Sequence, residues 1–121
     1  MSKKILIVED YEDTRNFMKF LIESYGYQVI EAADGIEAVD QAKHLSPDLI
    51  LMDISLPMVD GLTATRAIRE SNTAAKLPII AVTAFGKSYY DKAIAAGCND
   101  LIDKPVDFEM LKPVLNYYLQ S

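Results

Sequence analysis

Short apolar runs alternate with longer amphipathic stretches along the whole chain, and this alternation restricts the folds that it can adopt. Several runs place Ile and Val at consecutive positions, which is typical of strands buried on both faces; the runs cover residues 5–8, 27–32, 49–52, 79–82 and, more weakly, 101–102. Five strands that each precede a helix predict a parallel sheet with helices on both faces. The 121 residues contain no linker or low-complexity segment, so the sequence predicts one α/β domain over residues 1–121.

The first two helices are predicted from apolar residues that recur at intervals of three and four. Gly26 is a natural stop for the first helix, whose apolar stripe comprises Phe17, Met18, Leu21, Ile22 and Tyr25. In the second helix Asp34 can cap the amino terminus, and Glu37 stands three residues later as in a capping box. The apolar side of this helix comprises Ile36, Ala38, Val39 and Ala42.

Three further helices are expected near residues 62–70, 87–96 and 108–119. Gly97 would end the second of these, and Asp107 can cap the third. Pro113 lies inside the third, where it removes one backbone hydrogen bond and should bend the helix early.

Charged or hydroxyl side chains follow four of the five predicted strands. In open parallel sheets the functional crevice lies beyond the carboxyl ends of the strands, so these side chains should converge on one edge. Each of them alone is more often a solvated or turn residue, and it is their convergence that predicts a site. In chain order they are Glu9, Asp10, Asp53, Thr83 and Lys104.

Three carboxylates held close together repel one another and need a compensating cation. Lys104 compensates only in part, and a divalent metal would complete the balance. Oxygen ligands with open positions suit Mg²⁺, which binds through a few carboxylates and a phosphate. A carboxylate beside such a metal can attack phosphorus to give an aspartyl phosphate, and phosphoryl transfer mostly requires positioning and neutralisation of charge.

The ordered motifs resemble the receiver domain of response regulators in two-component signalling. The resemblance covers essentially the whole chain and rests on the segments Ile7-Val8-Glu9-Asp10, Asp48-Leu49-Ile50-Leu51-Met52-Asp53, Pro57-Met58-Val59-Asp60-Gly61, Val82-Thr83-Ala84 and Lys104-Pro105. Each motif is weak alone, but the ordered set is highly specific. The resemblance implies a flavodoxin-like, doubly wound fold, with a five-stranded parallel sheet in the order 2-1-3-4-5 flanked by five helices.

The resemblance also implies a role for each residue at the predicted edge. Asp53 matches the phosphoacceptor, and it belongs to the Mg²⁺ site together with Glu9, Asp10 and the backbone carbonyl of Ser55. The domain would assist its own phosphorylation and dephosphorylation without being a turnover enzyme.

Two further residues match the groups that contact the phosphoryl group. Thr83 matches the hydroxyl that turns to bond it, and Lys104 matches the lysine that pairs with a phosphate oxygen. The bond between Lys104 and Pro105 is expected to be cis. The implied phosphoryl donor is a phosphohistidine on a histidine kinase or a histidine phosphotransfer protein, and the implied output is altered binding of a downstream protein effector.

One position departs from the family pattern. Leu101 stands three residues before Lys104, where the family often has Tyr or Phe, so the usual coupling of a rotating aromatic ring to the threonine is in doubt. Phe85 lies two residues after Thr83 in the same predicted loop. We therefore expect Phe85, or the loop as a whole, to contribute part of the switch.

Two surfaces are candidates for partner binding. The first helix is where the family's histidine-bearing partners usually dock, and the candidates are Tyr11, Thr14, Arg15 and Met18. An equally good interpretation makes Met18 a core residue and Arg15 a solvated one. The family's usual output face lies on the fourth and last helices, where the candidates are Tyr89, Tyr90, Tyr117 and Tyr118.

Other functions fit the sequence less well than the phosphoryl-accepting switch. A phosphorylation-independent interaction module of the same fold remains the alternative, although such modules usually lose part of the acidic set or the lysine. An aspartyl-phosphate phosphatase would need a second Asp where Ser55 stands, and a P-loop that includes Gly86 would need Gly in place of Ala81. His44 and Cys98 are each the only residue of their type, which disfavours a zinc site or a Cys/His catalytic pair.

Charge and termini set the remaining expectations. The chain has 12 basic and 18 acidic residues, a net charge of −6, which disfavours nucleic acid or an anionic membrane as a partner. A single cysteine and an apolar run of only four residues near Met1 indicate a cytoplasmic protein. The last predicted helix ends close to Ser121, so we expect a stand-alone protein that is a monomer or weak dimer.

Overall fold

The structure is a computed structural model that describes residues 2–56, 58–71 and 76–119. Within these residues it contains five strands, β1 (Lys4–Val8), β2 (Gln28–Ala32), β3 (Leu49–Asp53), β4 (Ile79–Thr83) and β5 (Asp100–Asp103). The helices are α1 (Glu12–Ser24), α2 (Gly35–Leu45), α3 (Gly61–Glu70), α4 (Tyr90–Ala96) and α5 (Phe108–Leu119), and a short 3₁₀ turn, η2 (Gly86–Tyr89), precedes α4.

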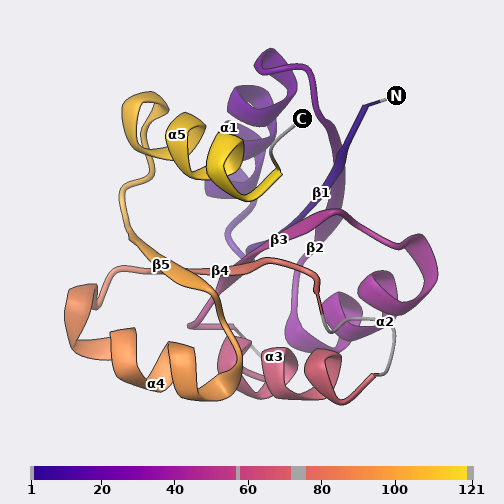
Figure 1. The fold of residues 1–121 in the computed structure, drawn as a ribbon, viewed down its shortest axis with the longest axis vertical. Coiled ribbons are helices and arrows are strands. Elements are labelled where there is room, and N and C mark those ends of the chain that lie inside the picture. The colour runs from indigo at the N-terminus through magenta and orange to yellow at the C-terminus, as the bar shows by residue number, and fades with distance from the viewer. Residues whose placement is uncertain (1, 57, 72–75, 120–121) are drawn as a thin grey trace.

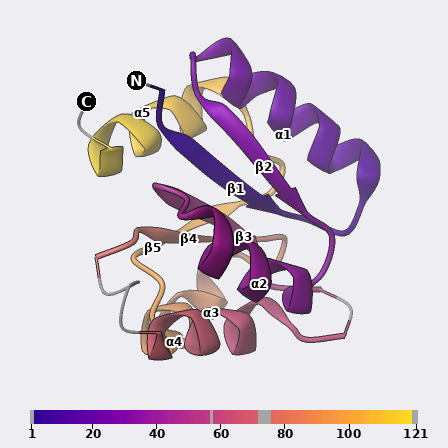
Figure 2. The ribbon, with the colours of Figure 1, turned by 90° about the vertical axis from the view of Figure 1, so that its right-hand side faces the viewer.

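The strands form one parallel sheet in the order β2-β1-β3-β4-β5, as expected. Helices α1 and α5 cover one face, and α2, α3 and α4 cover the other (Figures 1 and 2). Because alternate residues of a strand point to opposite faces, β1 places Ile5 and Ile7 against the α1–α5 layer and Leu6 and Val8 against the other layer. The consecutive apolar positions in the sequence therefore reflect two separate hydrophobic cores.

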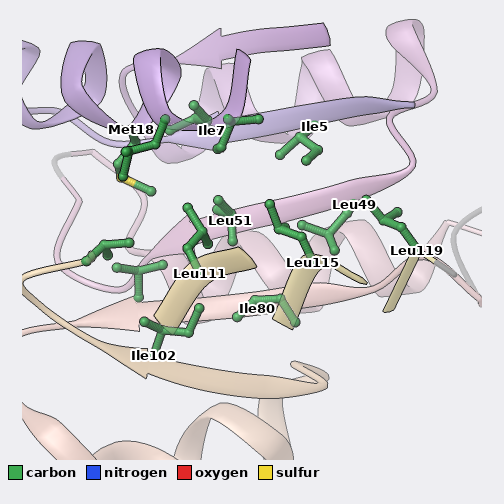
Figure 3. Close-up of a cluster of buried hydrophobic side chains, with 14 residues drawn as sticks. Ile5, Ile7, Met18, Leu49, Leu51, Ile80, Ile102, Leu111, Leu115 and Leu119 are labelled. Carbon is green, nitrogen blue, oxygen red and sulfur yellow. The ribbon is translucent and has the colours of Figure 1, made fainter. Parts of the chain in front are cut away.

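The core beneath α1 and α5 is the one drawn in Figure 3. Ile5, Ile7, Leu49, Leu51 and Ile80 come from the strands, while α1 contributes Met18 and α5 contributes Leu111, Leu115 and Leu119. Burial of this many Ile and Leu side chains, at roughly 1.5–3 kcal/mol each, is the main favourable term that holds the two helices to the sheet.

No helix in the described part of the chain is long and apolar enough to cross a membrane.

Most predicted helix ends agree with the structure. Asp34 accepts a hydrogen bond from the amide of Glu37 at 2.8 Å, and Asp107 accepts one from the amide of Met110 at 2.8 Å. Gly26 and Gly97 follow helix ends with φ of 95° and 114°, values that favour glycine. Helix α5 continues through Pro113 to Leu119.

Other boundaries differ from the sequence prediction. Strand β2 begins at Gln28 rather than at residue 27, and α3 begins at Gly61, because the Asp60 carboxylate accepts the amides of Leu62 and Thr63 and so caps the helix one residue earlier. The predicted helix 87–96 divides into η2 and the shorter α4.

The apolar stripes of the first two helices were predicted with the wrong width. Met18, Leu21 and Ile22 are buried against the sheet, but Phe17 is 52% exposed. Successive helical residues are about 100° apart, and this spacing puts Phe17 at the edge of the face that Met18, Leu21 and Ile22 share. Ile36 of α2 is likewise 53% exposed.

Two glycines allow the connection between β3 and α3 to pack tightly. A Cβ atom at Gly61 would overlap the carbonyl oxygen of Asp53, and one at Gly35 would overlap the carbonyl oxygen of Val59. The amide of Gly61 also donates to the carbonyl of Ile54 at 3.0 Å. The main chain just after Asp53 therefore lies directly against the first turn of α3.

We expect Gly61→Ala to lower the free energy of unfolding by about 2 kcal/mol or more, because the new methyl group must displace the Asp53 backbone. The matched control is Gly26→Ala, where a Cβ meets nothing within 4 Å and only the positive φ of 95° opposes the substitution. That control should lose about 1 kcal/mol. Urea unfolding measures both variants, and equal losses would show that the contact with Asp53 has no special weight.

Candidate functional site

Acidic side chains from two strand ends meet at the carboxyl edge of the sheet. Glu9 and Asp10 follow β1, and Asp53 ends β3. One carboxylate oxygen of each lies within 4.8 Å of the others. Glu9 and Asp53 are 2% and 3% exposed, whereas Asp10 is exposed. Because hard oxygen donors at this spacing suit a divalent cation such as Mg²⁺, the donor set fits a metal of that class.

Lys104 lies directly after β5. Among the described residues, its ammonium group is the one that bonds to this cluster. Its Nζ lies 2.7 Å from Oε1 of Glu9 and 3.2 Å from Oδ2 of Asp53. The peptide bond between Lys104 and Pro105 is cis. A single positive charge is thus shared by two buried carboxylates, and the site keeps an excess of negative charge.

The excess charge shows in the pKa values. Burial and the neighbouring negative charge of Glu9 raise the pKa of Asp53 to about 6, against the opposing effects of Lys104 and the Ser55 amide. Burial also acts to raise the pKa of Glu9, but the hydrogen bonds from Lys104 and the amide of Tyr11 outweigh it and hold that pKa below its ordinary value. Burial acts to lower the pKa of Lys104, and its bonds to the two carboxylates raise it overall.

The remaining predicted residues lie at the same edge of the sheet as Asp53. The amide of Ser55 donates to Oδ1 of Asp53 at 3.0 Å. Thr83 ends β4 and is buried, and its hydroxyl oxygen accepts the amide of Phe85 at 2.9 Å. The carbonyl of Thr83 accepts the amide of Lys104 at 2.8 Å. The bond to Phe85 uses the Thr83 oxygen as an acceptor and leaves the hydroxyl proton for another partner.

Phe85 connects this edge of the sheet to the surface near α4. Its ring is 52% exposed and stacks on Tyr89 with centroids 4.9 Å apart. Leu101 and Tyr89 both pack against the core on the α2–α3–α4 side. Of the other tyrosines, Tyr90 and Tyr117 are exposed, and Tyr118 donates from its hydroxyl to Asp100 at 3.1 Å.

Helix α1 presents a different set of residues than expected. Met18 is 2% exposed, so the interpretation of Met18 as a core residue is correct. Arg15 is neither free nor fully solvated, because its guanidinium donates to the main-chain carbonyl of Glu9 at 2.9 Å and to Oε1 of Glu31 at 3.1 Å. Tyr11 is exposed and Thr14 is half-buried.

A groove of about 510 Å³ lies between α1 and the segment after β5. Its lining is mostly apolar, and it includes Lys104, which also belongs to the acidic site. The lining residues are Asp13, Thr14, Phe17, Met18, Ala84, Lys104, Pro105 and Val106. The sequence prediction of a buried Phe17 is wrong, since its side chain is 52% exposed and lines this groove. A helical wheel centred on Met18, Leu21 and Ile22 would have placed it at the edge of the buried stripe.

We expect Asp53→Asn to raise the free energy of unfolding by about 1–3 kcal/mol at neutral pH without added metal, because the amide removes a charge that the folded state disfavours. The pKa of Asp53 in the folded protein, about 6, lies above its ordinary value of 3.8. In wild type, the cost of the Asp53 charge to the free energy of unfolding is therefore complete above pH 6 and vanishes below pH 3.8. The advantage of the variant should therefore fade over that interval in urea unfolding. Asp40→Asn, at a side chain 70% exposed, is the control, and an equal gain there would contradict the assignment.

Comparisons with known proteins agree with this geometry. A family model described as the response regulator receiver domain matches residues 5–116. The polar-differentiation response regulator DivK of Brucella ovis is 39% identical over 120 residues, which cover 98% of each chain.

Solved structures give the same result. The receiver domain of a sensor histidine kinase from Pseudomonas aeruginosa, with a magnesium ion coordinated in its active site cleft, is 37% identical, with a TM-score of 0.92 and full coverage of both chains. The chemotaxis protein CheY4 of Vibrio cholerae is 27% identical, with a TM-score of 0.91 over 98% of this chain and 99% of that one. With its sheet order and the family match over nearly its whole length, this chain belongs to the response regulator receiver domain family.

Proposed function

We propose that this chain is a phosphoryl-accepting switch in which Asp53 takes a phosphoryl group from a phosphohistidine, with Mg²⁺ bound beside it. The donor would be a histidine kinase or a histidine phosphotransfer protein. The observation that supports this most strongly is the buried Asp53 carboxylate, which lies among Glu9, Asp10 and Lys104 with a surplus of negative charge. A surplus of this kind favours a divalent cation, and a carboxylate beside one can act as a nucleophile.

Each residue has a part in the proposed transfer. A carboxylate oxygen of Asp53 attacks phosphorus, an O–P bond forms, and the P–N bond breaks with its electron pair leaving on the imidazole. Since the pKa of Asp53 is about 6, most of the carboxyl groups are ionised at neutral pH and able to attack. Glu9, Asp10, Asp53 and the carbonyl of Ser55 would hold Mg²⁺, which when bound neutralises charge on the phosphoryl oxygens.

Two further groups would stabilise the phosphorylated state. Lys104 Nζ already reaches Asp53 at 3.2 Å and can pair with a phosphoryl oxygen in the same place. Thr83 can donate its hydroxyl proton to a second oxygen. Hydrolysis would return Asp53 to its free form, so the protein would be modified in each cycle rather than turn over a substrate.

The groove beside α1 suits a partner that must bring a phosphohistidine to Asp53. It is mostly apolar, it is lined by Phe17, and Lys104 connects it with the site. An apolar helix surface on the partner could pack there while its histidine reaches the carboxyl edge of the sheet. We propose this surface, with Phe17 in place of Met18, as the docking surface for the donor.

The phosphorylation chemistry can be tested by intact-mass spectrometry after incubation with a small phosphoryl donor. Wild type should gain the mass of one phosphoryl group with Mg²⁺ and little without it, because the metal neutralises charge during transfer. Asp53→Asn should gain none, while Asp40→Asn, which changes an exposed carboxylate on α2, should behave as wild type.

No gain in wild type with any donor, including a phosphorylated histidine protein, would contradict the switch. That result would favour the phosphorylation-independent interaction module, and capture of partners by the unmodified protein would then be the next measurement.

The output is proposed to depend on Phe85. If Thr83 turns towards a phosphoryl oxygen, the amide of Phe85 loses its 2.9 Å bond, and the ring that stacks on Tyr89 becomes free to move. Phe85→Ala should therefore reduce the difference in effector affinity between phosphorylated and unphosphorylated protein by about threefold or more, the effect of an aromatic contact worth roughly 0.5–1.5 kcal/mol. Binding titrations of both forms measure this, and an unchanged difference in affinity would exclude Phe85 from the switch.

A further inference from the structure

We infer that Arg15 is a positioning residue for the metal site and that it acts through the main chain of Glu9. This inference rests on the proposed function, because it concerns the site that would bind Mg²⁺. The Arg15 guanidinium donates to the main-chain carbonyl of Glu9 at 2.9 Å, and not to the Glu9 carboxylate. Its effect on the metal would therefore be indirect.

Every polar group of Glu9, in both its main chain and its side chain, makes a hydrogen bond within the protein. Its amide donates to the carbonyl of Ala32 at 3.1 Å, and its carbonyl accepts from Arg15. Its two carboxylate oxygens accept from Lys104 at 2.7 Å and from the amide of Tyr11 at 3.0 Å. Because Glu9 is only 2% exposed, its carbonyl would lose its protein partner in a poorly hydrated place if the guanidinium were removed.

A second nitrogen of the Arg15 guanidinium is anchored as well. Nε lies 3.1 Å from Oε1 of Glu31, a residue of β2, and the Arg15 side chain is 18% exposed. A planar guanidinium can bond two acceptors at fixed angles, which a lysine ammonium on a flexible stem does poorly. Arg15 thus joins α1 and β2 to Glu9, the residue directly after β1 at which the acidic pair begins.

The charge of Arg15 and its geometry predict opposite effects on metal binding. A positive charge near the cluster repels a divalent cation, so loss of the charge alone would tighten Mg²⁺ binding. Loss of a positioning contact would weaken it, since groups that orient metal ligands usually change affinity by about tenfold or more. The sign of the change in Kd therefore separates the two roles.

The experiment is to measure the Kd for Mg²⁺ of the full chain from the midpoint of thermal unfolding at increasing MgCl₂ concentration. Arg15→Met, which keeps a long side chain without charge or donors, should bind Mg²⁺ about tenfold more weakly than wild type. Lys19→Met is the matched control. Lys19 also pairs with Glu31, at 3.4 Å, and its loss should leave the Kd unchanged or slightly lower. Arg15→Lys, which keeps the charge, should recover only part of the affinity.

An unchanged or tighter Kd in folded Arg15→Met would overturn the inference, even if its unfolding midpoint without Mg²⁺ fell. If that variant does not fold, Arg15→Lys is the test, because it keeps the positive charge and loses the planar guanidinium that bonds both acceptors. It should raise the Kd by about threefold, and an unchanged Kd would again overturn the inference. A wild type without any Mg²⁺ response would instead overturn the proposed function itself.

Discussion

The ion pairs of Lys104 with Glu9 and Asp53 are the interaction on which the arrangement of the site depends. They join residues 95 and 51 positions apart in the sequence, at the ends of three different strands. Two buried carboxylates so close together would repel each other without this cation. One ammonium makes the fold compatible with the acidic cluster, but it does not neutralise the cluster.

This incomplete neutralisation connects stability with function. A pKa of about 6 at Asp53 means that the folded protein holds this buried carboxylate in an unfavourable charged state at neutral pH. Any ligand that adds positive charge would relieve that state, and metal binding should therefore stabilise the fold. Beyond the cluster, the bond from Thr83 to the Phe85 amide and the stacking of Phe85 on Tyr89 lead towards α4. A change at Asp53 thus has a short physical path to the surface.

The strands could be predicted from sequence because apolar residues at consecutive positions have few explanations other than burial on both faces. The strand order came from the resemblance of the motifs, since periodicity alone does not order a sheet. The predicted apolar stripe of α1 was too wide, because Phe17 lies at the edge of the face that Met18, Leu21 and Ile22 share and is 52% exposed. The contact of Arg15 with Glu9 could not be predicted, because its acceptor is a backbone carbonyl, which every residue has.

The glycine contacts described above also have a mechanical consequence. The carbonyl of Asp53 lies against Gly61, and that of Val59 lies against Gly35, in both places without room for a methyl group. The backbone therefore has little room to move where it leaves β3 and enters α3. A displacement of the Asp53 main chain would be transmitted as a push on the first turns of α3 and α2. The packing that fixes the Asp53 main chain thus ties the positions of these two helices to any strain that arises at the site.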